Sequence, residues 1–262
     1  PYDSFEDEEL TSYEIGFKGM INDRLQVLAT AFYYDFQDYQ QIIQVLDFLP
    51  DGRPFDRTVI DNIPDTTIMG LELESTWAVT DNFTLRGMYA YQDSELGYIV
   101  TTENRDPNST FREESFTNPV TGEQEIAILA ETFNFEGNEL PNTPSHKFSL
   151  TGDYVFRLNG GDLVWTTSYS YTDERYARIS NAPITEIDSF DRLDTSLTYR
   201  PYDANWRVSF FAENLLDEVG IQELQIQSFA DGFGAGATLT DPRFYGWLWE
   251  MENEVRAVVP MM

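Results

Sequence analysis

The feature that most constrains this chain is a two-residue alternation of apolar and polar side chains that recurs along its length. In residues 82–92 (NFTLRGMYAYQ), Phe83 and Leu85 fall on one side of the backbone, and Thr84 and Arg86 fall on the other. A period of two predicts an extended strand with two unlike faces. Nine segments of roughly ten residues follow this pattern, with Leu28 and Phe32 as its main exceptions. The nine segments are 13–21, 24–34, 70–79, 82–92, 147–156, 163–172, 192–200, 206–214 and 244–252.

The connections between these segments alternate between short and long. The short ones are rich in Asn, Asp and Gly, which is typical of tight hairpin turns: NDR (22–24), TDN (80–82), LNGGD (158–162) and PYDAN (201–205). The long ones span 47–66, 93–146, 173–190 and 215–243. In an up-and-down sheet this order places all tight turns at one end and all long loops at the other. Outer-membrane barrels have this asymmetry, with short periplasmic turns and long extracellular loops.

The alternation also predicts which face of each strand meets lipid. A strand of about nine to eleven residues, tilted by about 45°, spans the hydrocarbon layer. The polar face carries Lys18 and Arg86 among several carboxylates, and a Lys or Arg at the lipid midplane would cost about 2–4 kcal/mol. We therefore expect Leu85 to face lipid and Arg86 to face a wide, wet or plugged lumen. Because an antiparallel sheet with one solvated face alternates in the same way, a soluble sandwich remains the alternative fold.

The composition excludes several classes of function. The net charge of −30 argues against nucleic-acid binding, which requires a basic surface. The absence of cysteine excludes disulfides, zinc–thiolate sites and cysteine nucleophiles. His146 is the single histidine, and no nucleophile–base pairing accompanies it, so we predict that the chain is not an enzyme and has no catalytic, metal or cofactor site. The chain opens at Pro1 directly before a strand segment, as expected for the middle of a longer protein.

Several motifs resemble the late barrel strands of TonB-dependent outer-membrane receptors. In chain order they are TSYEIGFKG (11–19), LQVLATAFYYDFQDYQ (25–40), DTTIMGLELES (65–75), LPNTPSHKFSL (140–150), FFAENLLDE (210–218) and DPRFYGWLWE (241–250). The fifth is similar to the Asn-Leu-Phe-Asp element that ends the family's penultimate strand, and the sixth resembles the opening of its final strand. These motifs cover almost the whole chain in the family's order.

The resemblance implies a transmembrane antiparallel up-and-down β-barrel of 22 strands, plugged by an N-terminal domain. Residues 1–262 would then be the C-terminal portion of that barrel, with about nine strands and without the plug and the earlier strands. Its location would be the outer membrane of a Gram-negative cell. Family members usually end on an aromatic residue, whereas this chain departs from the pattern and continues through NEVRAVVPMM (253–262).

The function implied by the resemblance is the binding and import of a scarce solute. A ferric siderophore is the first choice, and cobalamin or an oligosaccharide the next, with energy from the TonB system. The implied partners are outer-membrane lipid, the plug domain of the same receptor, TonB acting through the absent N-terminal part, and the small-molecule ligand. Two alternatives from other classes are a passive porin-like barrel and a soluble acidic β-sandwich that binds glycans.

The substrate-binding residues cannot be assigned from the sequence, but one loop offers candidates. The stretch DERYARIS (173–180) places Arg175, Tyr176 and Arg178 at a predicted extracellular strand end. Such side chains could hold an anionic ligand through bidentate hydrogen bonds.

The connection 93–146 is the longest, and we predict that it is extracellular, lacks regular structure and takes part in ligand capture. Phe111, Phe133 and Phe135 could form an aromatic lid within it. Its acidic stretches lack the spacing of a twelve-residue calcium loop, so they are predicted to be solvated surface.

Overall fold

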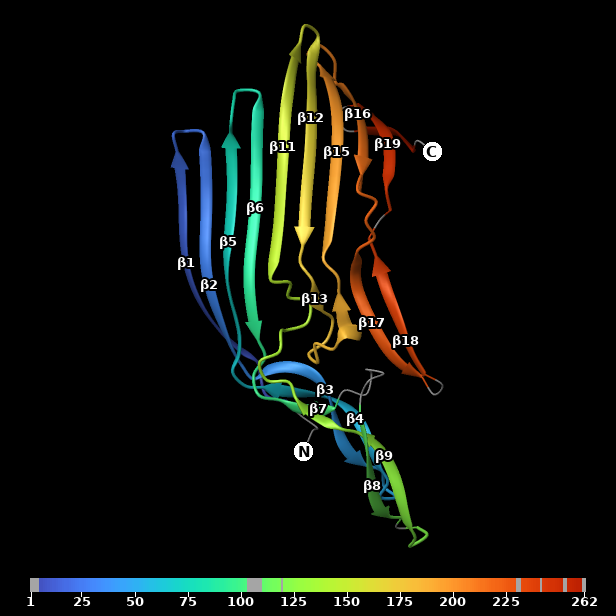
Figure 1. Cartoon of the computed structure of the whole chain (residues 1–262). Coiled ribbons are helices and arrows are strands. Elements are labelled where there is room, and N and C mark those ends of the chain that lie inside the picture. Colours follow the sequence, from blue (N-terminus) through green and yellow to red (C-terminus); the bar gives the residue numbers. More distant parts are fainter. Residues whose placement is uncertain are drawn as a thin grey trace.

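The computed structural model describes residues 5–102, 110–118, 120–229, 232–240, 242–251 and 254–260. Its centre is one ten-stranded antiparallel sheet in which each strand pairs only with its neighbours (Figure 1). The strands, in sheet order, are β1 (Glu9–Ile21), β2 (Leu25–Gln37), β5 (Thr66–Ala78), β6 (Phe83–Glu95), β11 (His146–Leu158), β12 (Gly161–Thr172), β15 (Phe190–Pro201), β16 (Trp206–Glu213), β19 (Phe244–Met251) and β20 (Glu254–Pro260). The sheet is open, with β1 at one edge and β20 at the other. Within the described ranges, no helix is long and apolar enough to cross a membrane.

The all-β, up-and-down fold predicted from the alternation is confirmed, with one strand more than the nine expected. The tenth strand, β20, lies in the tail 253–262 and pairs with β19 through an irregularity at Trp249 and Glu250. Its sequence EVRAVVP is rich in β-branched valine, but apolar and polar residues alternate only over its first four positions before the apolar run VVP. The two-residue pattern therefore could not identify it, although its β propensity is high.

The tight turns all lie at one end of the sheet, at the top of Figure 1. Between β1 and β2, Asn22 and Asp23 both have left-handed φ angles, of 50° and 53°. The Arg24 backbone N–H closes this turn by donating to the Ile21 carbonyl at 3.2 Å. Two consecutive left-handed residues define the hairpin turn whose twist matches that of the flanking strands, and Asn and Asp tolerate it well. The predicted asymmetry of short turns and long loops is confirmed.

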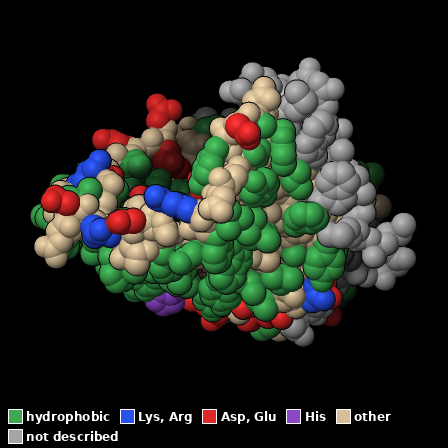
Figure 2. Space-filling model, turned by 90° about the horizontal axis from the view of Figure 1, so that it is seen from above, with side chains coloured by type: hydrophobic (Ala, Val, Ile, Leu, Met, Phe, Trp, Pro, Cys, Tyr) green, Lys and Arg blue, Asp and Glu red, His purple; other side chains and the backbone are tan. Residues whose placement is uncertain are grey.

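The strand register aligns the apolar residues of neighbouring strands into rows. Leu85 on β6 lies opposite Trp77 on β5, and Tyr154 on β11 lies opposite both Phe83 and Trp165. We call this side of the sheet the apolar face. It is largely uncovered in the described chain: Trp165, for example, is 49% exposed. In Figure 2, hydrophobic side chains form a broad band across the view, with charged side chains at its margins. The large apolar side chains of this face are exposed, so the described residues do not form the two packed sheets of a sandwich.

The two exceptions to the alternation, Leu28 and Phe32, lie on the opposite side, which we call the polar face. Phe32 pairs with Glu14 and Gly70. Its ring covers Gly70 so closely that a Cβ atom there would come within 2.5 Å of the Phe32 ring. Phe32 is therefore an apolar residue on a polar face because it packs over a neighbouring glycine, a pairing that compensates for the missing side chain.

The long connections contain small hairpins at the end opposite the tight turns (Figure 1). Four pairs of consecutive strands are β3 (Tyr39–Phe48) with β4 (Pro54–Ile63), β8 (Phe111–Thr117) with β9 (Gln124–Ala130), β13 (Arg175–Tyr176) with β14 (Glu186–Ile187), and β17 (Ile221–Phe229) with β18 (Gly232–Leu239). A fifth two-stranded sheet pairs β7 (Val100–Thr102) with β10 (Thr132–Asn134), which flank β8 and β9 in the chain. The prediction that the longest connection lacks regular structure is therefore wrong. Its residues 103–109 and 119 lie outside the described ranges.

Candidate functional site

The long connections meet in a hydrophobic core of their own, beyond the end of the ten-stranded sheet. Three connections supply it, within residues 38–65, 96–145 and 173–189. Its members are Ile43, Val59, Ile63, Leu96, Ile99, Phe135, Leu140 and Ile179. Ile63 and Leu96 are 0% and 1% exposed, as in the interior of a soluble domain. We call this part of the molecule the loop assembly.

Polar contacts join the same connections. The Glu139 backbone N–H donates to Asn181 Oδ1 at 2.7 Å, and Asn181 Nδ2 donates back to the Glu139 carbonyl at 3.1 Å. In a second pair, the Gln44 backbone N–H donates to the Thr101 hydroxyl at 3.1 Å, and that hydroxyl donates to the Gln44 carbonyl at 2.6 Å. These bonds give backbone groups that lose contact with water on docking a partner in another loop, so the docked arrangement leaves them satisfied.

The predicted candidates Arg175, Tyr176 and Arg178 lie in this assembly, but Arg175 has a structural role. Arg175 Nη2 donates to the Ile221 carbonyl at 2.9 Å and to the Gln222 carbonyl at 3.2 Å, which ties β13 to β17. Burial lowers the pKa of this guanidinium, although an arginine stays charged at neutral pH. Arg178 is also engaged in an interaction. The geometry therefore supports a structural role for Arg175, which connects two loops, more directly than a role in binding an anion.

The other arginines described in the long connections are paired with carboxylates. Arg53 pairs with Asp51 and Arg57 with Asp47, both at 2.8 Å, Arg112 with Glu114 at 3.8 Å, and Arg243 with Asp217 at 3.7 Å. The connections contain no lysine and many more Asp and Glu than Arg. Their surface is therefore negative, and four of its described arginines are paired with carboxylates of the same loops.

Glu139 shows the effect of this negative field. Burial raises its pKa, and repulsion from Asp93, Glu174 and Asp173 raises it further. The hydrogen bonds to Asn181 hold the Glu139 backbone in place within this acidic part of the loop assembly. Among the described residues, no three His, Asp or Glu side chains are grouped so as to hold a metal ion.

The three aromatic residues proposed as a lid have different environments. Phe135 is 8% exposed and belongs to the core of the loop assembly. Phe133 is 40% exposed and stacks on Phe135, with ring centroids 6.2 Å apart, and Phe111 is 53% exposed. The lid interpretation is therefore wrong for Phe135, which stabilises the loops. Phe111 and Phe133 remain accessible.

His146, the single histidine, opens β11 among aromatic side chains. Its Nδ1 is 2.9 Å from the Tyr89 hydroxyl. Its ring lies 6.0 Å from that of Tyr89 and 5.3 Å from that of Tyr91. These contacts make it part of an aromatic cluster at the loop end of the sheet, where amphipathic rings are expected at a membrane interface.

The polar face of the sheet carries paired charges and hydroxyl groups. Arg86 forms an ion pair with Asp153 across β6 and β11. Arg192 Nε lies 2.8 Å from Asp194, and its Nη2 lies 3.2 Å from Glu213. The face is thus suited to water or to a polar partner, and its pairing limits the number of uncompensated charges.

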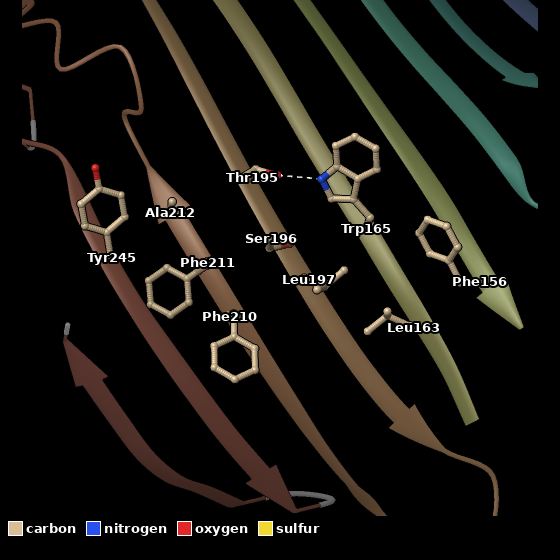
Figure 3. Close-up of a pocket in the computed structure, with 10 residues that line it drawn as sticks. All are labelled: Phe156, Leu163, Trp165, Thr195, Ser196, Leu197, Phe210, Phe211, Ala212 and Tyr245. Atoms are coloured by element: carbon tan, nitrogen blue, oxygen red, sulfur yellow. Dashed lines mark hydrogen bonds between the residues drawn. The ribbon is translucent and has the colours of Figure 1, made fainter. Parts of the chain in front are cut away.

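The apolar face holds two hollows of about 810 and 530 Å³. Figure 3 shows the larger one, with Trp165, Phe210 and Tyr245 among the side chains around it. Polar side chains that could orient a solute are few here, and the hollow lies on the side opposite the charged residues. The larger hollow is therefore not a candidate for capturing a polar solute.

Comparison with known proteins gives one family. Residues 1–215 match the family model described as "TonB dependent receptor-like, beta-barrel". The metal-pseudopaline receptor CntO of Pseudomonas aeruginosa (strain UCBPP-PA14) is 25% identical over 218 residues, which cover 82% of this chain and 24% of that protein. The chain thus spans about a quarter of the length of the curated relatives it matches.

Solved structures share the fold. The ferric yersiniabactin uptake receptor FyuA from Yersinia pestis superposes with a TM-score of 0.65 at 17% identity, over 93% of this chain and 30% of that one. The siderophore receptor PiuA from Acinetobacter baumannii gives a TM-score of 0.60 at 22% identity, over 92% of this chain and 28% of that one.

Proposed function

Because this chain belongs to the TonB-dependent receptor β-barrel family, we propose that it is the C-terminal wall of a receptor that imports a scarce solute, with a ferric siderophore as the first candidate. Members of the family are outer-membrane barrels of Gram-negative bacteria, and they are transport receptors rather than enzymes. The apolar face of the ten-stranded sheet therefore faces lipid, and the polar face lines the lumen.

The observation that carries the proposal is the loop assembly. A passive channel needs only an open lumen. In this chain, a buried core and hydrogen bonds between loops hold the loops in fixed positions beyond one end of the sheet. A preorganised surface lowers the entropy cost of binding a ligand. Capture of a dilute solute before its passage inward is the role that such a surface serves best.

The ligand and the energy source complete the proposal. Relatives include receptors for metal-pseudopaline and ferric yersiniabactin, which supports a metal chelate as cargo here. We infer that the lumen face contacts a plug domain in the whole receptor, and that TonB supplies energy through that N-terminal part. Cobalamin and oligosaccharides are the next candidates.

Uptake by cells that express the full-length receptor tests this function. Iron-starved cells should accumulate a radiolabelled ferric siderophore from a panel, and uptake should stop when the proton-motive force is collapsed. Uptake of many small solutes that continues without the proton-motive force would instead identify a passive porin. If no metal chelate is taken up but cobalamin or an oligosaccharide is taken up in an energy-dependent way, the proposed ligand is wrong and the assignment as a transport receptor stands.

A further inference from the structure

The two hollows on the apolar face lie in line on either side of Trp165, which lines both, and together they cross β11, β12, β15 and β16. We call the two hollows together the trench. Its floor is a row of small side chains in direct register: Gly152, Thr167, Thr195 and Ala212. Leu85 on β6 and Tyr245 on β19 close the two ends of this row. The trench exists because the register places four small residues side by side, between rows of much larger ones.

Large side chains form the rims of the trench. Its rim residues are Phe83, Leu150, Tyr154, Trp165, Tyr169, Leu197 and Phe210. Trp165 lines both hollows, and in Figure 3 its indole reaches across toward Thr195 on the neighbouring strand. No charged side chain lines either hollow in the described chain.

The hydroxyl groups in the floor do not make it polar. Trp165 Nε1 donates to the Thr195 hydroxyl at 2.9 Å, and that hydroxyl donates to the Thr166 carbonyl at 3.0 Å. The Thr167 hydroxyl lies 2.9 Å from the Thr195 hydroxyl and shares the same network. Since these polar atoms bond to one another, the surface left for an occupant consists mainly of methyl groups, aliphatic side chains and aromatic rings.

We propose that this trench is a lipid site, in which a hydrocarbon chain of a membrane lipid is held against the outside of the barrel. The trench is continuous with the lipid-facing surface of the sheet. Gly152 is the seventh of the thirteen residues of β11, so the floor lies at the depth of acyl chains rather than of headgroups. A chain in the trench gains dispersion contacts from the floor and both rims, whereas a chain on a flat wall contacts protein on one side only.

Fluorescence quenching by brominated phospholipid in bilayers tests the site on the full-length receptor. Trp165 is compared with the probe of a Leu73→Trp variant, on the same face but not lining the trench. Leu73 is five residues from the turn end of β5 and Trp165 is four from that of β12, so the two probes lie at similar depth. Each probe is studied in a variant in which the other tryptophans are replaced by phenylalanine. Half-maximal quenching of Trp165 should require a severalfold lower mole fraction of brominated lipid than that of the probe at position 73. Equal quenching curves would refute the lipid site.

Filling the trench provides the second arm. A Cβ at Gly152 would meet only ordinary contacts, the nearest at 3.4 Å from the Phe83 ring, so Gly152→Leu should fold and occupy the smaller hollow. The double variant Gly152→Leu/Ala212→Leu should bring the quenching curve of Trp165 to that of the Leu73→Trp probe. Ala31→Leu, a matched change on the apolar face opposite Ile15 and Leu71, should leave the difference intact.

Two results would overturn the proposal in this arm. In the first, the filled variant keeps the full preference of Trp165 for brominated lipid. In the second, a cysteine introduced at Ala212 cross-links two copies of the receptor efficiently in the bilayer, which would show that protein covers the trench. Neither result bears on solute uptake, so the proposed transport function is tested separately.

Discussion

The assignment of the two faces predicts a graded response to arginine substitution along β5 and β6. Leu73 lies on the apolar face near the middle of β5, five residues before its end at Ala78. Leu85 shares that face but is only the third residue of β6. At about 3.3 Å per residue and a tilt of about 45°, Leu85 lies only about 5 Å in depth from the periplasmic end of its strand. Met88 lies on the polar face, opposite Glu74.

The expected costs follow from depth. Leu73→Arg should destabilise the folded barrel by about 2–4 kcal/mol, as for a charge at the bilayer midplane, and Leu85→Arg by about 1 kcal/mol or less, as near an interface. Met88→Arg should be close to neutral, since a guanidinium there enters a wet lumen beside the Glu74 carboxylate.

Urea titration of the full-length receptor in lipid vesicles measures these free energies of unfolding. Heat modifiability on gels reports assembly in cells. The order of loss should be Leu73→Arg, then Leu85→Arg, then Met88→Arg. Equal losses at Leu73 and Met88 would show that the faces are wrongly assigned, and with them the membrane orientation of the sheet.

Four further outcomes follow from the loops. Phe135→Ala should destabilise the loop assembly by about 3–5 kcal/mol and raise hydrogen exchange in β3 and β7, whereas Phe111→Ala, at an exposed position, should not. Glu139→Gln should stabilise the loops above the pKa of an unfolded glutamate, because the raised pKa penalises the charged folded form. This gain in stability should vanish at lower pH, where Glu139 is protonated in both the folded and the unfolded loops. Hydrogen exchange of the loop amides measures it, and a gain of the same size at every pH would contradict the prediction. Protease added to whole cells should cut within 93–146, and cleavage only after the outer membrane is breached would reverse the orientation. Added salt should weaken binding of a cationic ferric chelate and strengthen that of a polyanionic one, because the loops are negative; the opposite trend in titration calorimetry would refute this charge argument.

Local pattern in the sequence determined the strands, their faces and the turns. A strand has a side-chain period of two whatever it packs against, so the segment 82–92 reveals both of its faces without knowledge of its neighbours. The Asn22–Asp23 turn is equally local, because two consecutive left-handed residues suit these side chains. The segment β20 was missed because its alternation covers only four residues and then gives way to the apolar run VVP.

Contacts between distant segments decided the rest. Ile63, Leu96 and Phe135 are scattered apolar residues in polar loops, and no period marks them, yet docking of the loops buries all three. Arg175 resembles a ligand-binding residue in the sequence, but β17 lies within reach and its carbonyls occupy the guanidinium. The trench depends on register, since Gly152 and Ala212 are sixty positions apart and become neighbours of one row only when four strands align. Period and turn chemistry act within a few residues, whereas burial, pairing and register depend on which strands and loops meet in space.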